Sequence, residues 1–425
     1  MYILFYLIFI LIAIIMSIKI EKTIITSLFI CVIGFCLFPI LADLCVYKLY
    51  LFNKLSIKVH YFNLIAVVSF FVGYLFIMMN KNYFIKKKRS NKECSQFVRD
   101  KLIIGINISS WILIFPYLIK SMRLINEKGW SYSRDYVTSG LLFESTILEI
   151  IYIWIIFPVF IVTALYAYLE NLRKSEKGKI LVFVSIISLT IHTIMFSARA
   201  LIIKYLAYFM LCYILYGKSK KVKIRGKALI MVIFLLISAT FITAQRSAGK
   251  SIYENVLIYY VCPFHLLNYY IENPMFSNLY DYQYGKVMFG FIYNIYEAIK
   301  YVLFGIPYNG SDKLITQITA ISIPLGYGIR MNAGSTAIYP LFRDFGVISI
   351  ILGFFLTAIV TGYYRNKAMD ERDLRSRAIY IYLLYIVFRY SSSYRDVFSP
   401  EFLFCVIYIF FFVGINKHDK NIVKN

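Results

Sequence analysis

Charged residues are scarce in this sequence. Asp, Glu, Lys and Arg make up 16% of its 425 residues, whereas 60% of the residues are hydrophobic. A typical water-soluble domain is about 25% charged and about 45–50% apolar. A water-soluble fold has too little core volume to hide so much apolar surface. The shortage of charge therefore excludes an ordinary soluble protein and favours a chain whose outer surface faces lipid.

The short motifs of familiar soluble enzymes are also missing. The sequence has no Walker motif, no Gly-x-Gly-x-x-Gly turn, no His-Glu-x-x-His, no Gly-x-Ser-x-Gly and no Asp-x-Asp-like metal motif. We therefore expect no ATP hydrolysis, no metal and no cofactor. The seven cysteines form no Cys-x-x-Cys pair and lie mostly in apolar runs, so we expect them to pack as small core residues.

Long apolar runs are abundant. A spanning helix needs about 20 mostly apolar residues, and this criterion predicts an all-α polytopic integral membrane protein with about 11 transmembrane helices (range about 10–12). No internal repeat relates these runs, which disfavours transporters built from two similar halves. The predicted spans are 2–18, 24–47, 61–80, 102–119, 145–169, 179–197, 200–216, 228–245, 336–363, 378–390 and 402–415.

Acidic residues are outnumbered by basic ones, 22 against 46. The basic residues gather between the apolar runs, in clusters at 81–101, 173–179, 218–227 and 365–377. All four clusters fall on one side when the spans are threaded in order, and the positive-inside rule makes that side cytoplasmic. The excess charge is thus a topology signal, and no nucleic-acid partner is expected. An odd number of spans places the N-terminus outside, and we interpret the first run as a retained span because it has no basic segment before it and no cleavage site.

We expect a single membrane domain, 1–425, with two external segments. Residues 246–335 form the larger external loop, which we expect to contain short helices, and residues 120–144 form the smaller one. Loops this long are usually functional. The larger loop is rich in Tyr, Asn, Gly and Pro, and its segment 287–304 is apolar enough to lie flat at the membrane interface or to dip into it.

Several charged residues lie where insertion into the membrane does not require them. Arg199 stands between two spans, Arg246 opens the large external loop, Arg343 and Asp344 lie in the outer part of the run 336–363, and Arg389 ends the run 378–390. Charges in or beside spans are costly and suggest function. The arginines would suit an anion, since a guanidinium binds phosphate oxygens through two bonds. The alternative is structural: snorkelling at helix ends or pairing with other charges.

His265 is one of only four histidines in the chain. An imidazole can accept a proton from an attacking hydroxyl near neutral pH. His265 is therefore the available candidate for a general base, with Asp344 and Glu254 as weaker candidates, although a lone histidine is more often structural.

The chain resembles the Wzy-type polymerases, which join oligosaccharide repeat units of O-antigens and capsules. The architecture matches over nearly the whole chain, with local similarity at 196–205, 245–270 and 330–346. The residues that carry the resemblance are Ser197-Ala198-Arg199 at the start of a span, Gln245-Arg246 at the start of the large loop, Asn332-Ala-Gly-Ser-Thr336 at its end, and Tyr339-Pro340-Leu-Phe-Arg343-Asp344-Phe345-Gly346 after it.

The resemblance implies a metal-independent glycosyltransferase in the bacterial cytoplasmic (inner) membrane, active on its external side. Its substrate would be an oligosaccharide on undecaprenyl pyrophosphate, and its partners would include membrane lipid, a chain-length regulator and a flippase. Catalysis would fall to His265, Arg343 and Asp344, and binding of sugar or pyrophosphate to Arg199, Arg246, Asn332, Thr336 and Arg389. The alternatives are an O-antigen ligase-like transferase, a flippase for lipid-linked oligosaccharides, and a structural component of an export complex.

Overall fold

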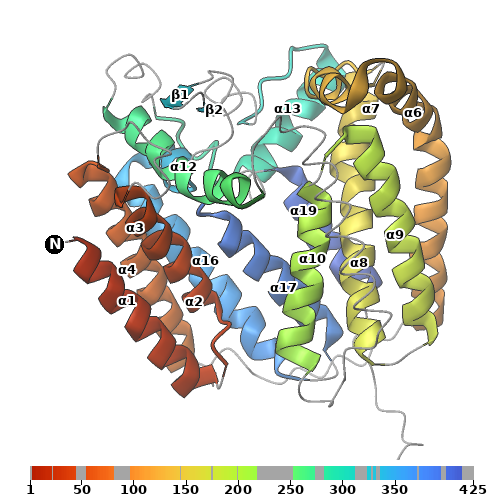
Figure 1. The fold of residues 1–425 in the computed structure, drawn as a ribbon. Coiled ribbons are helices and arrows are strands. Elements are labelled where there is room, and N and C mark those ends of the chain that lie inside the picture. The colour runs from red at the N-terminus through yellow and green to blue at the C-terminus, as the bar shows by residue number, and fades with distance from the viewer. Residues whose placement is uncertain are drawn as a thin grey trace, which may run out of the picture. The chain divides into compact units, whose positions relative to one another are not determined.

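The computed structural model is built almost entirely of helices (Figure 1). It describes residues 2–21, 23–44, 54–80, 96–143, 145–173, 176–198, 200–217, 252–272, 282–311, 323–326, 329–331, 336–370, 373–393 and 399–413. The helices are α1 (Tyr2–Met16), α2 (Ser27–Val32), α3 (Phe38–Asp43), α4 (Ile57–Met79), α6 (Gln96–Thr138), α7 (Thr146–Ile150), α8 (Phe157–Leu172), α9 (Glu176–Phe196), α10 (Ala200–Cys212), α12 (Ile252–Glu272), α13 (Gly290–Phe304), α15 (Ile338–Phe345), α16 (Val347–Ala368), α17 (Leu374–Arg389) and α19 (Pro400–Phe412). π-Helical segments extend or join them: η1 (Ser17–Glu21), η2 (Ile33–Leu37), η4 (Ile151–Ile156) and η5 (Tyr213–Gly217).

Seven continuous helices in the described part of the chain are long and apolar enough to cross a membrane, which makes this a helical membrane protein. They are Tyr2–Glu21, Ile57–Met79, Asp100–Thr138, Thr146–Leu172, Gly178–Phe196, Ala200–Gly217 and Val347–Ala368. Each overlaps a predicted span. Two shorter apolar helices, Ser27–Asp43 and Pro400–Phe412, and α17 overlap three more. The predicted span 228–245 lies outside the described residues.

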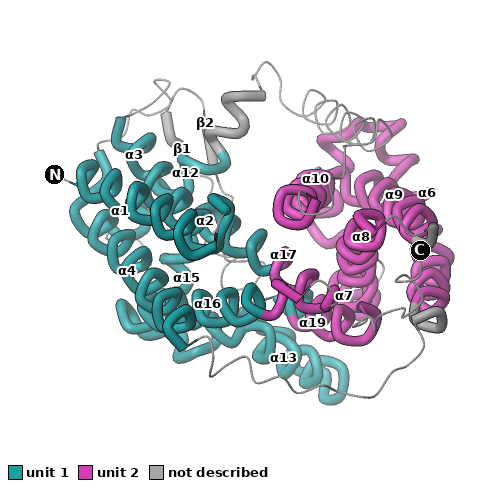
Figure 2. The backbone as a smooth tube through the Cα atoms, turned by 90° about the horizontal axis from the view of Figure 1, so that it is seen from below, with its two compact units in different colours: residues 1–86, 253–366, 383–402 teal, residues 87–252, 367–382, 403–425 magenta. Residues whose placement is uncertain are grey.

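The chain divides into two compact units (Figure 2). Unit 1 contains residues 1–86, 253–366 and 383–402, and unit 2 contains residues 87–252, 367–382 and 403–425. The first part of α17 belongs to unit 2, and its last part belongs to unit 1.

In unit 1, α4 and α16 pack closely through glycines. A Cβ on Gly73 would lie 2.6 Å from the backbone oxygen of Phe355, and a Cβ on Gly362 would collide with Cγ2 of Ile77. Small residues let helix backbones approach within a membrane, where apolar side chains gain little by leaving lipid. The two glycines therefore allow α4 and α16 to pack at short range.

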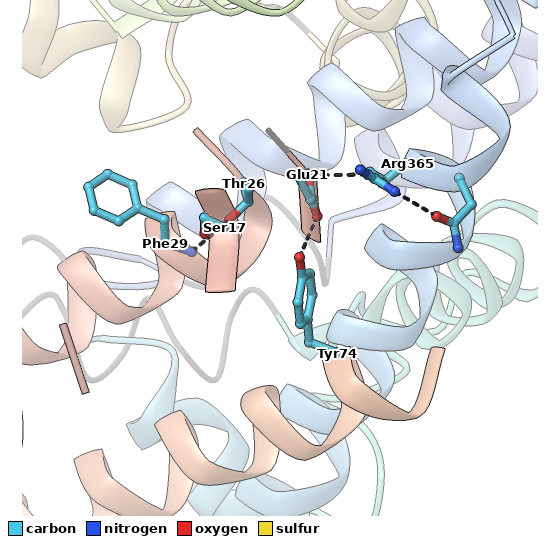
Figure 3. Close-up of polar contacts among 7 residues, drawn as sticks. Ser17, Glu21, Thr26, Phe29, Tyr74 and Arg365 are labelled. Carbon is cyan, nitrogen blue, oxygen red and sulfur yellow. Dashed lines mark hydrogen bonds and ion pairs between the residues drawn. The ribbon is translucent and has the colours of Figure 1, made fainter. Parts of the chain in front are cut away.

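A buried polar network links the end of η1, which continues α1, to α4 and α16 (Figure 3). The hydroxyl of Tyr74 donates to Glu21 at 2.5 Å, and Nε of Arg365 lies 3.1 Å from the other carboxylate oxygen of Glu21. Arg365 also donates to the Asn366 side chain at 3.0 Å. Because Glu21 and Arg365 are both buried, each compensates the charge of the other.

Unit 2 is held by hydrogen bonds between helices. Asn107 of α6 donates to Thr163 of α8 at 2.8 Å, and Ser188 of α9 donates to Asn107 at 2.9 Å. Trp111 in turn donates to Ser188 at 3.0 Å. Each of these polar groups thus finds a partner on a neighbouring helix, as a hydrocarbon surrounding requires.

The segment 120–144 is helical over most of its length. Helix α6 continues to Thr138, with a break in its direction at Gly129, where φ is 84°. This positive φ is accessible to glycine at little cost, so the chain changes direction there and then resumes helical geometry. The expected external loop therefore begins within a helix rather than in an irregular turn.

The predicted span 336–363 is divided in two. Helix α15 ends at Phe345, Gly346 has a φ of 64°, and α16 starts at Val347. Arg343 and Asp344 thus belong to a separate short helix rather than to the outer part of a span. The apolar composition on both sides of Gly346 concealed this turn, because a hydropathy pattern carries no information about φ.

The segment 246–335 contains two helices and a hairpin among its described residues. Helix α12 carries an internal proline at Pro263. Strands β1 (Ile323–Gly326) and β2 (Ile329–Met331) pair antiparallel, with Ile323 opposite Met331. In Figure 1, α13 runs across the direction of α16 of the same unit.

Candidate functional site

Asp43 and His60 lie side by side in unit 1, with His60 buried and Asp43 mostly buried. Asp43 is the last residue of α3, and His60 lies in the first turn of α4. The carboxylate Oδ2 is 3.1 Å from Nε2 of His60, and Oδ1 accepts the backbone N–H of Leu55 at 3.0 Å. The chain thus returns from α3 to α4 with both carboxylate oxygens satisfied and the imidazole fixed in orientation.

The imidazole of His60 also contacts two tyrosines of α1. Nδ1 of His60 is 2.9 Å from the hydroxyl of Tyr6, and the ring of Tyr2 stacks on the imidazole with the ring centres 4.5 Å apart. When a neutral ring donates its Nε2–H to Asp43, Nδ1 remains to accept the hydroxyl proton of Tyr6. Both nitrogens of His60 are therefore engaged by protein groups.

His265 lies on α12 beside the same carboxylate. It is buried, with 3% of its surface exposed. Burial lowers the pKa of His265 to about 4, although the negative charge of Asp43 and the backbone of Ala42 act in the opposite direction. His265 is thus neutral at pH 7. The side chain of Asn268, one turn further along α12, accepts the backbone N–H of Ser56 at 2.8 Å and fastens α12 to the start of α4.

Helix α15 packs on the two helices that carry these histidines. The ring of Tyr339 stacks on that of Tyr270 of α12, with the ring centres 4.8 Å apart. The ring centre of Phe342 lies 5.1 Å from that of Phe62 of α4. Arg343 is buried, and among the described residues no acceptor lies within hydrogen-bonding distance of its Nε. The Arg343 cation opposes the rise in the pKa of Tyr339 that burial causes. Asp43 interacts with both His60 and His265, while Tyr339 and Arg343 lie on the helix that packs on α4 and α12. We call these five residues the histidine–arginine cluster.

Thr336 and Arg389 each precede a residue of a backbone hydrogen bond that joins the start of α15 to the end of α17 (Leu374–Arg389). Thr336 is buried, and its carbonyl accepts the backbone N–H of Tyr339 at 3.3 Å. The backbone N–H of Ala337, the next residue, donates to the carbonyl of Tyr390 at 2.7 Å. Arg389 precedes Tyr390, and its positive charge opposes the rise in the pKa of Tyr260 on α12 that burial causes. Both predicted binding residues therefore lie next to the hydrogen bond between Ala337 and Tyr390.

The side chain of Asp344 accepts hydrogen bonds from the backbone of another segment. Its carboxylate accepts the N–H groups of Gly285 at 3.1 Å, Val287 at 3.0 Å and Met288 at 2.5 Å. Burial raises the pKa of Asp344, while these three bonds and Arg343 oppose the rise. A carboxylate held by three N–H groups is a clamp on residues 285–288, and this arrangement favours a structural role for Asp344 over proton transfer.

Unit 2 has polar groups of its own next to position 199. Arg134 donates to the carbonyl of Phe196 at 3.1 Å, and the buried Lys204 lies 5.5 Å from the ring centre of Phe157. Ser197 adopts a φ of 45°, which is uncommon for a residue with a side chain and makes the connection from α9 to α10 tight. Arg199, Arg246 and Asn332 themselves lie outside the described residues, as does the side chain of Glu254.

Asp43 and His60 were not among the site residues predicted from the sequence. Asp43 is an acid within the apolar run 24–47, so the rule that charges in spans suggest function would have selected it. The pairing of Asp43 with His60 was not predictable, because it depends on how α3 and α4 are placed after the connection between them.

No group of three or more His, Cys, Asp or Glu side chains in the described ranges is arranged to hold a metal ion. What the histidine–arginine cluster offers is an imidazole beside a carboxylate, a buried guanidinium and a phenol. Such groups can accept a proton and stabilise an oxyanion. Comparison with known protein families, with curated proteins and with solved structures gave no match.

Proposed function

We propose that this protein polymerises oligosaccharide repeat units carried on undecaprenyl pyrophosphate, as its resemblance to Wzy-type polymerases implies. In this proposal about eleven spans lie in the bacterial cytoplasmic membrane, and the reaction takes place on the external side. A sugar hydroxyl of one unit attacks the anomeric carbon of another. The new glycosidic C–O bond forms as the bond to pyrophosphate breaks, the hydroxyl proton passes to a base, and the lipid pyrophosphate leaves.

The observation that carries the proposal is the burial of Arg343 in the histidine–arginine cluster. A buried guanidinium whose Nε meets no acceptor among the described residues suits an anionic group brought by a substrate. Developing charge on a leaving pyrophosphate is such a group, and fixed cations stabilise it most where water is excluded. Arg199 and Arg246 are further candidates for the same charge.

The predicted topology agrees with an external site. The basic clusters at 81–101 and 365–377 are assigned to the cytoplasm, the first following α4 and the second lying at the end of α16. The pair Asp43–His60 lies at the opposite end of α4, and Arg343 precedes α16. Both ends therefore face outward in this topology.

Within the cluster, His265 is the proposed base. Both nitrogens of His60 are engaged by Asp43 and Tyr6, whereas the charge of Asp43 also acts on His265 and would stabilise its protonated form. His265 is neutral at pH 7, which is the state needed to accept a proton. His60 would then position Asp43 rather than touch the substrate.

The test is polymerisation by the purified protein supplied with a lipid-linked repeat unit. The expected product is a ladder of lengthening chains. We expect His265→Gln to lower the rate by about 10²–10⁴-fold and Arg343→Lys by about 10²-fold, because an ammonium lacks the planar fork of a guanidinium. We expect Arg199→Ala and Arg246→Ala to leave only products of repeat-unit size.

Two matched variants control for the loss of a buried side chain. His192→Gln removes a buried imidazole and Arg377→Lys a buried guanidinium, both in unit 2 and outside the cluster. These variants should retain the ladder. A ladder of normal length from His265→Gln and Arg343→Lys at normal protein levels would refute the assignment. Transfer of a single unit to lipid core would indicate a ligase, and lipid movement without reaction a flippase.

A further inference from the structure

Helix α13 of unit 1 exposes an apolar face. Ile292, Tyr296, Ile299 and Leu303 recur at intervals of four, three and four residues, so they lie on one side of the helix. Leu303 is 68% exposed and Ile292 57% exposed. The stripe continues past the end of the helix to the exposed Ile306. A face of this kind in water would be costly, since each large apolar side chain gains by leaving water.

The opposite face of α13 is polar and buried. Asn294 is 1% exposed, and its side-chain oxygen accepts both the backbone N–H of Ser311 at 2.6 Å and its hydroxyl at 2.9 Å. Glu297 is 2% exposed and lies 2.7 Å from Nζ of Lys300. A surface helix of a soluble protein has the reverse arrangement, with apolar residues inward. The surroundings of the outer face of α13 are therefore apolar.

The start of α13 is fixed beside a membrane-spanning helix. Asp344 holds residues 285–288 through three backbone N–H groups, and α13 begins at Gly290. Asp344 itself lies three residues before Val347, where the spanning helix α16 starts. The first turn of α16 also exposes an apolar residue, Ile348, which is 62% exposed. A spanning helix turns such residues to lipid, so α13 starts close to where α16 enters the bilayer.

Cations stand beside the aromatic residues of α13. Nζ of Lys300 lies 5.0 Å from the ring centre of Tyr296, and Nζ of Lys286 lies 5.5 Å from that of Tyr293. Tyrosines and lysines with apolar bodies and polar tips are typical of the headgroup layer of a membrane. Figure 1 also shows α13 running across the direction of α16, as a helix lying along a membrane surface would.

We propose that α13 lies in the surface of the bilayer leaflet into which α16 enters, with Ile292, Ile299 and Leu303 among the acyl chains and Lys286 and Lys300 at the headgroups. The partner of this face is thus the lipid bilayer itself. This proposal rests on the membrane-spanning character of α16 and stands independently of the reaction proposed above.

The test measures the depth of single nitroxide labels in nanodiscs that hold one copy of the chain. Cysteines are introduced at Ile299 and Leu303 in the background Cys45→Ser/Cys94→Ser, because five other cysteines are buried. Collision rates with oxygen and with a neutral nickel chelate then report lipid and water. Controls are labels at Ile112, exposed on a spanning helix, and at Asp370, exposed after α16.

The expected result is that both α13 labels collide with oxygen more than with the nickel chelate, as the Ile112 label does. Collision chiefly with the nickel chelate, as at Asp370, would overturn the proposal by placing α13 in water. Low collision rates with both reagents would also overturn it, since another protein segment would then cover the face. A label at Ile292 repeats the measurement on the first turn, so that one misfolded variant does not decide the outcome.

Discussion

Replacing Arg365 by methionine tests whether the buried network of Figure 3 holds unit 1 together. The substitution keeps most of the apolar stem and removes the guanidinium that lies 3.1 Å from Glu21. Glu21 then keeps the hydroxyl of Tyr74 at 2.5 Å but loses its compensating charge. The side chain of Asn366 loses a donor at 3.0 Å in the same step.

The expected cost follows from the burial of both partners. The side chain of Arg365 is 6% exposed and that of Glu21 is 2% exposed. Breaking such a pair from one side costs about 3–5 kcal/mol, because a charge is left buried without its partner. Removing both charges, in Glu21→Gln/Arg365→Met, should cost much less than Arg365→Met alone. Tyr74→Phe, which removes a hydrogen bond to a charged group, should cost about 1.5–3 kcal/mol.

The assay is titration with SDS in mixed micelles, followed by the reactivity of a thiol reagent with Cys31 and Cys36. Both thiols are buried in unit 1, so their reactivity reports the opening of that unit. Lys58→Met is the control, because Lys58 and Glu272 form an exposed pair at 4.0 Å, and exposed pairs are worth about 0–1 kcal/mol. Unfolding of Arg365→Met and the double variant at the same SDS fraction would refute the predicted role of the buried charge. The predicted role would also be refuted if Arg365→Met unfolded at the same SDS fraction as Lys58→Met.

Three further predictions concern packing, pH and the clamp on α13. Gly73→Ala should lower the yield of folded protein, because its Cβ would meet a backbone oxygen at 2.6 Å, whereas Gly105→Ala should leave the yield unchanged, because nothing lies within 4 Å of its Cβ. Titration of His265 should by itself lower the free energy of unfolding by about 2 kcal/mol between pH 7 and pH 5, because its pKa is about 4 when folded and about 6.5 when unfolded. The unfolded chain binds this proton first, so His265→Gln should reduce the fall by about that amount. Asp344→Asn should speed amide hydrogen exchange at residues 285–288, since one amide oxygen replaces a carboxylate that accepts three N–H bonds; unchanged exchange there would contradict the clamp.

The spanning helices were predictable because lipid acts on each stretch of chain separately. A run such as 61–80 has to be apolar wherever it sits in the bundle, and α4 accordingly covers Ile57–Met79. The short predicted span 378–390 corresponds to α17, which extends into the basic flank before it and starts at Leu374. The division of 336–363 at Gly346 was missed, because a turn between two apolar segments leaves the average hydropathy unchanged.

The candidate site was predictable only in part. His265 and Arg343 were selected from the sequence, since a rare histidine and a cation beside a span stand out by residue type alone. The bonds from Asp344 to backbone groups almost sixty residues earlier were not readable from a local pattern. They require α15 and the segment 285–288 to lie side by side, which is a property of the folded chain.

Composition alone determined that this chain is a helical membrane protein, because the cost of placing charge in lipid adds up residue by residue and is visible in any run of sequence. Only the tertiary structure decided which polar side chains share a buried site. Asp43, His60 and His265 come from three helices, and Arg343 comes from a fourth that packs on two of them. The 3.1 Å contact between Asp43 and His60 satisfies groups from two helices, and such a distance between separate segments exists only once the helices have packed.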